Sequence, residues 1–173
     1  MHITFTPMTE PDARAICAWR YPAPYDTYDV GEPEQALTEM LDPRSPYFAA
    51  RDEHGELIGY LCFGTAATVS DAPEPRPFDA DGALCFGLGL RPDLTGQGKG
   101  LGLAFVRAGL DFARARFAPP AFRLYALTWN ERAIRVYERA GFQRVGVRRV
   151  VNRHGVLDFL EMSRTEPDGA RDD

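Results

Sequence analysis

An apolar run that leads straight into a glycine-rich loop, and then into a helical pattern, limits the folds open to this chain. Residues 82–90 predict a buried strand, residues 91–100 a turn-rich loop and residues 99–117 a helix. Residues 121–127 alternate in polarity as a further strand. A strand, a helix and a second strand in this order form a parallel pair with a crossover helix. The expected apolar side of that helix carries Leu101, Ala104, Phe105, Ala108 and Phe112.

The flanking segments predict antiparallel hairpins on both sides of this unit. The expected elements are a strand over 1–6, helices over 10–20 and 33–41, a hairpin of 46–52 and 56–64, a helix over 130–140 and a hairpin of 142–151 and 155–163. The order β-α-α-β-β-β-α-β-α-β-β indicates an α/β fold with one mixed sheet and helices on both faces. Residues 1–164 form a single expected domain, and the polar tail over 165–173 is expected to be disordered.

The composition of the chain limits which partners the protein binds and where in the cell it is located. The chain has 173 residues, which suits one domain, and its net charge of −5 argues against nucleic acid. No long apolar run is present, so we expect no membrane partner. The wide spacing of three cysteines favours buried free thiols over disulfides or a metal site. The N-terminus lacks a signal-peptide pattern, which favours a cytoplasmic location.

The loop over 95–100 has the composition of an anion site. Gly96, Gly98 and Gly100 alternate with other residues directly before a helix. Backbone N–H groups in such a loop can point into one concavity, and the helix dipole adds positive charge. The loop fits neither the dinucleotide fingerprint nor the nucleotide-triphosphate loop, which would need glycine in place of Asp93 and Ser or Thr in place of Gly100. The alternative is a tight turn without a ligand.

Two motifs resemble those of the GNAT superfamily of acetyl-CoA-dependent N-acetyltransferases. The loop ending in Gly98 and Gly100 is similar to the family's Gln/Arg-x-x-Gly-x-Gly/Ala signature. Asn130, Tyr137 and the pair Gly141-Phe142 are similar to its second hallmark helix. The resemblance implies a GNAT-like fold with strands 4 and 5 parallel and splayed, acetyl-CoA as co-substrate and no metal. It also implies coenzyme contacts at Leu88, Leu90, Thr95, Gly96, Gln97, Gly98, Lys99, Gly100, Leu101 and Asn130.

One motif position departs from the family pattern. Thr95 stands where the family usually has Gln or Arg, so a long polar side chain that would reach the pyrophosphate is missing. Thr95 offers a hydroxyl, and Gln97 or Lys99 could supply the reach. Lys99, the single lysine of the chain, also fits a solvated helix start.

The resemblance also assigns catalytic roles. Tyr137 matches the general acid that protonates the leaving thiolate, with a packed core aromatic as the alternative. The backbone N–H of Leu88 is expected to stabilise the acetyl oxygen, and Gly87 and Gly89 suit a bulged strand. Many family members have a glutamate base on the central strand. The matching positions, residues 83–86, are Ala, Leu, Cys and Phe, so the amine arrives unprotonated or another segment supplies the base.

The acceptor side is predicted from the segment between the first two helices. Tyr25, Asp26, Tyr28 and Asp29 combine aromatic rings with carboxylates, which suits a cationic amine. A solvated acidic surface is the alternative. We therefore expect an N-acetyltransferase that acts by direct attack of a primary amine, small molecule or peptide, as a monomer or homodimer. A non-catalytic acyl-CoA-binding or sensor module of the same fold is the alternative function.

Overall fold

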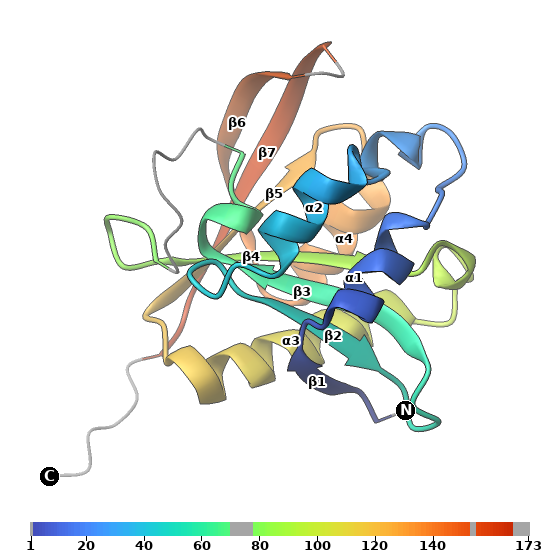
Figure 1. Ribbon diagram of the computed structural model, residues 1–173. Helices are drawn as coiled ribbons and strands as arrows, with labels where there is room; N and C mark the ends of the chain where they lie inside the picture. The colour runs from blue at the N-terminus through green and yellow to red at the C-terminus, as the bar shows by residue number, and fades with distance from the viewer. Residues whose placement is uncertain (1, 70–77, 153–154, 168–173) are drawn as a thin grey trace, which may run out of the picture.

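The computed structural model describes residues 2–69, 78–152 and 155–167, which fold around one seven-stranded mixed sheet (Figure 1). The strands lie in the order β1-β2-β3-β4-β5-β7-β6. Only β4 and β5 are parallel, and the other neighbouring pairs are antiparallel. The strands are β1 (Thr4–Pro7), β2 (Tyr47–Arg51), β3 (Leu57–Phe63), β4 (Leu84–Leu90), β5 (Ala121–Leu127), β6 (Gln143–Asn152) and β7 (Gly155–Thr165).

In the described part of the chain, four α-helices cover the two faces of the sheet (Figure 1): α1 (Glu10–Cys17), α2 (Pro33–Met40), α3 (Leu101–Phe117) and α4 (Glu131–Arg139). Side chains alternate along β2, so Tyr47 packs with α1 and α2 while Phe48 joins the larger core that includes α3. The larger core centres on Phe63, Phe86, Phe105 and Phe122, each at most 1% exposed. The predicted α/β architecture and element order are confirmed.

Caps explain where the helices begin and end. The Thr9 hydroxyl accepts the Asp12 N–H at the start of α1. That helix ends at Cys17, before the predicted residue 20, because the N–H groups of Ala18 and Trp19 bond to carbonyls three residues back. The third helix begins at Leu101 instead of residue 99, because Gly100 has a φ of 74° that no helix can contain.

The parallel pair of β4 and β5 separates along its length. Within the described residues it is paired only at Leu84 with Phe122 and at Cys85 with Arg123. Beyond Cys85 the fourth strand continues to pair with β3 up to Leu90, while β5 pairs with β7 over its whole length. The two strands therefore diverge toward their carboxyl ends, and the predicted splay is confirmed.

The predicted bulge at Gly87 and Gly89 is absent, because β3 and β4 keep one register from Phe86 to Leu90. Glycine is needed at these two positions because a larger side chain would collide with side chains of β3. A Cβ on Gly87 would lie 2.5 Å from the Cys62 sulfur, and one on Gly89 would lie 2.3 Å from the Tyr60 ring. The opening thus forms without a bulge, and both glycines make room for side chains of β3.

The last strand runs one residue past the predicted domain boundary, to Thr165. Glu166 then pairs with Arg114 of α3 and with Arg164, so the folded part includes it. The rest of the predicted tail, from residue 168 onward, lies outside the described residues.

Candidate active site

The glycine loop forms an open cradle between β4 and α3. Gly96, Gly98 and Gly100 have φ values of 72°, 69° and 74°, a repeated left-handed conformation that turns successive N–H groups toward one side. Cβ atoms on Gly98 or Gly100 would meet no atom within 4 Å. No side chain of the described residues caps the N-terminus of α3. The loop therefore offers backbone donors to an anion, aided by the helix dipole.

Two of the predicted coenzyme contacts on this loop already make internal hydrogen bonds. The Thr95 hydroxyl donates to the Pro92 carbonyl at 2.8 Å. The Gln97 side-chain amide donates to the Asp93 carbonyl. Lys99 is exposed. The Thr95 proton is thus occupied in closing the turn at the end of β4, whereas the backbone N–H groups remain the open part of the cradle.

The free edge of β4 presents the peptide groups of Leu88 and Leu90 to the opening. The Arg91 N–H donates to the Ile58 carbonyl on β3 at 2.9 Å. Because backbone groups alternate sides along a strand, Leu90 and Leu88 point to the opposite edge, toward β5. The Tyr21 hydroxyl confirms this direction, since it donates to the Leu90 carbonyl at 2.7 Å. The predicted position of the Leu88 N–H agrees with this geometry.

Asn130 connects α4 to the aromatic segment before α2. Its side-chain oxygen accepts the Ala133 N–H at 3.2 Å and so caps the N-terminus of α4. Its amide donates to the Tyr28 hydroxyl at 2.9 Å. Burial raises the pKa of Tyr28, and this hydrogen bond acts in the opposite direction. The two residues form a polar contact at the carboxyl end of β5.

Tyr137 lies on α4 and packs as predicted for a core aromatic. Its ring contacts Phe142 edge to face, with centroids 6.2 Å apart, and packs against the larger core. Burial raises the pKa of its hydroxyl above the ordinary value, and nearby Tyr28 acts in the same direction. The phenol therefore stays protonated at neutral pH. Packing and proton donation are compatible roles for this side chain.

Comparison with known proteins bears on this arrangement of splayed strands, glycine loop and tyrosine helix. Residues 12–142 match the model of the acetyltransferase (GNAT) family. The chain belongs to this family. It is an acetyl-CoA-dependent acetyltransferase whose acceptor is an amine. The alternative of a non-catalytic acyl-CoA module is not favoured.

Two curated relatives of this GNAT member are acetyltransferases. The N-alpha-acetyltransferase RimI of Mycobacterium tuberculosis is 31% identical over 96% of this chain and 94% of its own length. The mycothiol acetyltransferase of Propionibacterium freudenreichii is 36% identical over 65% of this chain, but only 36% of that protein is covered. A solved structure of spermidine N-acetyltransferase from Vibrio cholerae with CoA and spermine superposes with a TM-score of 0.70 at 19% identity, covering 94% of this chain and 95% of that one. It shares the fold.

The glycine cradle of this GNAT enzyme fits the pyrophosphate of acetyl-CoA. The cradle is open where side chains at Gly98 and Gly100 would block it, and its donors are uncharged N–H groups aided by a helix N-terminus. Beyond Cys85 the separation of β4 and β5 leaves backbone groups of β4 unpaired with β5. Contacts by the individual predicted residues remain predictions.

The predicted acceptor segment contains the short helix η1 (Tyr25–Tyr28), and its predicted residues differ in what they contact. Tyr25 packs on Trp129, with centroids 5.4 Å apart. The Asp29 carboxylate accepts the Tyr21 N–H at 2.8 Å and so holds the segment in shape. Asp26 is exposed. Trp129 was not anticipated from the sequence, because nothing in its local pattern indicates what it packs against.

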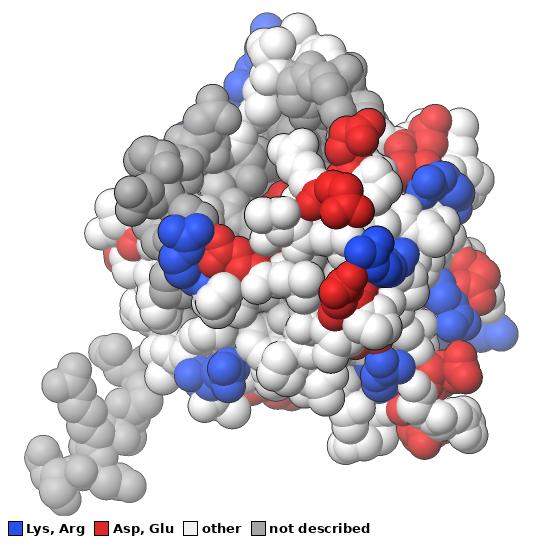
Figure 2. Space-filling view, viewed as in Figure 1, with Lys and Arg blue, Asp and Glu red and all other residues white. Residues whose placement is uncertain are grey.

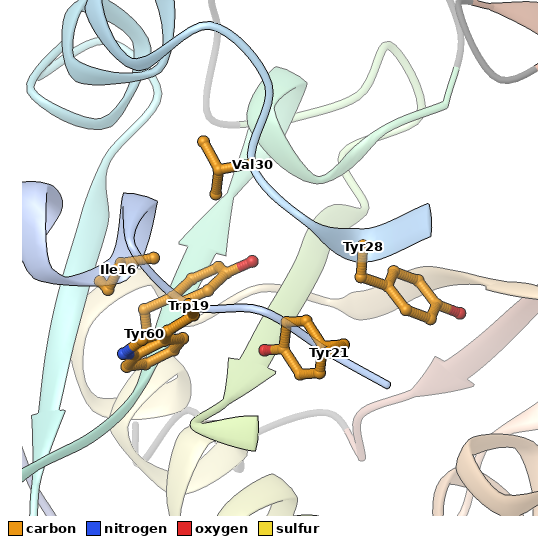
Figure 3. A pocket seen from close by; sticks show the side chains of 6 residues that line it. All are labelled: Ile16, Trp19, Tyr21, Tyr28, Val30 and Tyr60. Carbon is orange, nitrogen blue, oxygen red and sulfur yellow. The ribbon is translucent and has the colours of Figure 1, made fainter. Parts of the chain in front are cut away.

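Two adjoining hollows lie beside this segment. The smaller, shown in Figure 3, has Trp19 and Tyr60 together at one end and Tyr28 at the other, with Tyr21 between them. The larger has a volume of about 300 Å³ and includes Glu39, whose carboxylate accepts the Tyr47 hydroxyl at 2.9 Å. Both hollows are lined by Val30 and Tyr60, so they adjoin one another between Tyr28 and α2.

The larger hollow lies along an acidic surface. Glu32 and Glu39 line it, and acidic side chains gather over α2 (Figure 2). None of the helices in the described part of the chain has the length and apolarity that crossing a bilayer requires. The described residues also contain no cluster of three or more His, Cys, Asp or Glu side chains suited to a metal ion.

Proposed function

We propose that the acceptor is the N-terminal α-amino group of a polypeptide, which attacks acetyl-CoA directly in the opening between β4 and β5. The observation that carries this proposal is the lack of a carboxylate on the strand beside the opening. Every residue of β4 is apolar or glycine, and residues 83–86 are at most 5% exposed. A site without a carboxylate base on this strand suits an amine that is partly neutral at physiological pH.

The acidity of the acceptor distinguishes the candidate amines. An α-amino group has a pKa near 7.7–8.0, so roughly one in ten is neutral at pH 7. A lysine or polyamine nitrogen has a pKa near 10.4, so fewer than about one in a thousand is neutral. Only the neutral amine attacks. The α-amine therefore reacts without a strong protein base, whereas an alkyl amine depends on one.

Sequence similarity gives independent support. The relative that matches almost the whole chain is named an N-alpha-acetyltransferase. The structural neighbours named for spermidine share 20% identity or less. A peptide acceptor also agrees with the predicted cytoplasmic location, because new polypeptides expose this group there.

The catalytic roles follow from the positions of three groups. The Leu88 N–H points into the opening, where it would donate to the acetyl oxygen as negative charge develops. The Tyr137 hydroxyl would protonate the departing thiolate. The glycine cradle over 95–100 and Asn130 would hold the coenzyme while the amine approaches from the side of Tyr28.

The acceptor peptide would approach along the larger hollow, since the smaller one has a volume of only about 10 Å³. Tyr28 lines the smaller hollow, and the other predicted acceptor residues, Tyr25, Asp26 and Asp29, belong to the segment around it. Glu39 and Tyr60 line the larger hollow beside α2. The negative charge of this surface attracts the ammonium form, which then loses its proton to water as it reaches the opening.

The test compares acceptors that differ only in which nitrogen is free. One short peptide has a free N-terminus and no lysine, its counterpart has a blocked N-terminus and one lysine, and spermidine represents polyamines. We expect acetylation of the free α-amine, with kcat/KM rising with pH and levelling above about pH 8. A peptide with a more acidic α-amine should shift that profile to lower pH. Faster transfer to the blocked lysine peptide or to spermidine would refute the proposal.

A further inference from the structure

We propose that Arg132 binds the pyrophosphate of the coenzyme, supplying the cation that the loop lacks at Thr95, and that Tyr25 positions it. This inference concerns coenzyme binding and does not depend on which amine is the acceptor. It starts from the missing basic or amide side chain at the first position of the loop motif.

The placement of Arg132 brings its guanidinium onto the glycine cradle. The residue lies in the first turn of α4. Its Nη1 atom is 2.6 Å from the point that a Cβ on Gly96 would occupy, so the guanidinium rests directly on the loop backbone. A side chain at Gly96 would displace it. The absence of one there keeps the loop and the arginine in contact.

The side chains of the loop itself are poorer candidates for this role. The Thr95 hydroxyl proton is directed to the Pro92 carbonyl, and the Gln97 amide to the Asp93 carbonyl. Lys99 is exposed. Arg132 is exposed as well, but it presents a planar guanidinium with several donors, which suits paired phosphate oxygens better than the single ammonium of Lys99.

The charge of Arg132 is available to a ligand. Within the described part of the chain it forms no ion pair, whereas its neighbour Arg135 is paired with Glu131. A pyrophosphate held by the cradle would be the nearest strong anion for this guanidinium. Charge-assisted hydrogen bonds to phosphate are among the stronger polar contacts in proteins.

Tyr25 holds the guanidinium at this position. The Arg132 Cζ atom lies 4.4 Å from the centroid of the Tyr25 ring, and Trp129 packs on the same ring. This stacking leaves the edge of the guanidinium free for hydrogen bonds. Tyr25 is therefore a positioning residue for the coenzyme, although the sequence indicates it for the acceptor.

The first experiment measures coenzyme A affinity by calorimetry without any acceptor. Arg132→Gln should weaken binding by about 10- to 100-fold, the loss expected for a charged hydrogen bond. Arg139→Gln, on an exposed residue about two turns further along α4, should bind as wild type does. Lys99→Gln should lose less than Arg132→Gln. Unchanged affinity in a folded Arg132→Gln protein would overturn the proposal.

Two further experiments test which phosphate Arg132 contacts and whether positions 95 and 132 face the same group. The loss in Arg132→Gln should be equal for coenzyme A and 3′-dephospho-coenzyme A; a loss confined to coenzyme A would mean that the arginine meets the 3′-phosphate. Adding Thr95→Arg to Arg132→Gln should restore affinity, because both positions would then face the same group. A double variant as weak as Arg132→Gln would contradict that equivalence.

The role of Tyr25 is tested by a double-mutant cycle. Tyr25→Leu should weaken coenzyme binding in the wild-type background and have little further effect in the Arg132→Gln background. Equal losses in both backgrounds would show that Tyr25 acts independently of the arginine. Since no acceptor is present, these results stand apart from the test of the α-amine proposal.

Discussion

Tyr137 combines packing and chemistry in one side chain. Its ring packs against the core and Phe142, which fixes the direction of the hydroxyl. Burial raises the pKa of that hydroxyl, so the proton is retained until a strong acceptor such as a thiolate is present. A packed phenol that keeps its proton is suited to the proposed donation to the thiolate.

Replacing Tyr137 with Phe should separate the two roles. The ring and its packing remain, while the proton is lost. We expect turnover to fall by about 10²- to 10⁴-fold with little change in coenzyme affinity or melting temperature. Steady-state kinetics at saturating acetyl-CoA, combined with calorimetry, measures both quantities.

Tyr28→Phe is the matched control, since it removes a second phenol next to the same site. It should lose the hydrogen bond from Asn130 and cost less turnover than Tyr137→Phe. If Tyr28→Phe were the more damaging change, the proton donor would be Tyr28. Wild-type turnover in Tyr137→Phe, under conditions limited by chemistry, would leave Tyr137 as a core residue only.

Single residues differ in how far the sequence predicts their roles. The relative position of Asn130 and Tyr137 is predictable because both belong to one helix, where spacing fixes position, while their roles stay predictions. Arg132 is in the same helix, but its contacts with Tyr25 and Gly96 join segments far apart in the chain. Local pattern carries no information about such contacts, so the sequence alone could not find them.

At the scale of elements, the glycine loop is the part whose backbone matters most. Gly98 has a φ of 69°, and a Cβ added there would have no atom within 4 Å. A larger residue at this position would be strained and would occupy the cradle. The fold would survive, because the loop is exposed.

Gly98→Val should therefore weaken coenzyme A binding strongly while the protein remains folded. Gly55→Val is the matched control: Gly55 lies in the turn between β2 and β3, has a φ of 80° and is equally unobstructed. Both variants should lose about 1–2 kcal/mol of stability from backbone strain. Only Gly98→Val should lose affinity in calorimetric titrations; equal affinities in the two variants would place the pyrophosphate elsewhere.

The sequence predicts most helices and strands, but it predicts less well which side of each helix is buried. The predicted buried side of α3 is only partly right. Ala104 is exposed, while Leu103, Val106 and Leu110 are buried with Phe105. The apolar residues of this helix extend around most of its circumference, so periodicity alone does not select one stripe. Packing against the sheet determines which side of α3 is buried, because Phe86 and Leu61 pack closely against Gly109.

At the scale of the whole molecule, the two cores on opposite faces of the sheet enclose ionisable groups. Burial raises the pKa of the Cys62 thiol from 9.0 to about 12. The folded protein keeps this proton while the unfolded chain loses it above pH 9. The stabilising contribution is therefore complete below pH 9 and declines as pH rises toward 12.

Cys62→Ala should reduce this loss of stability at alkaline pH. Each ionising group contributes up to about 1.4 kcal/mol per pH unit. Between pH 8 and pH 10.5 the free energy of unfolding of the wild type should thus fall by about 2 kcal/mol more than that of Cys62→Ala. Urea denaturation at the two pH values measures the difference, and parallel declines would contradict the assigned burial of the thiol.

The opening between β4 and β5 is where we expect acetyl to pass directly from coenzyme to amine. Quantitative mass spectrometry of a reaction with acetyl-CoA and a peptide that has a free N-terminus tests this transfer most directly. We predict acetylated peptide and free coenzyme A in equal amounts, and no acetylated enzyme when the peptide is omitted. Acetyl groups accumulating on the enzyme before transfer, or no acetylated peptide at all, would contradict direct transfer to an α-amine.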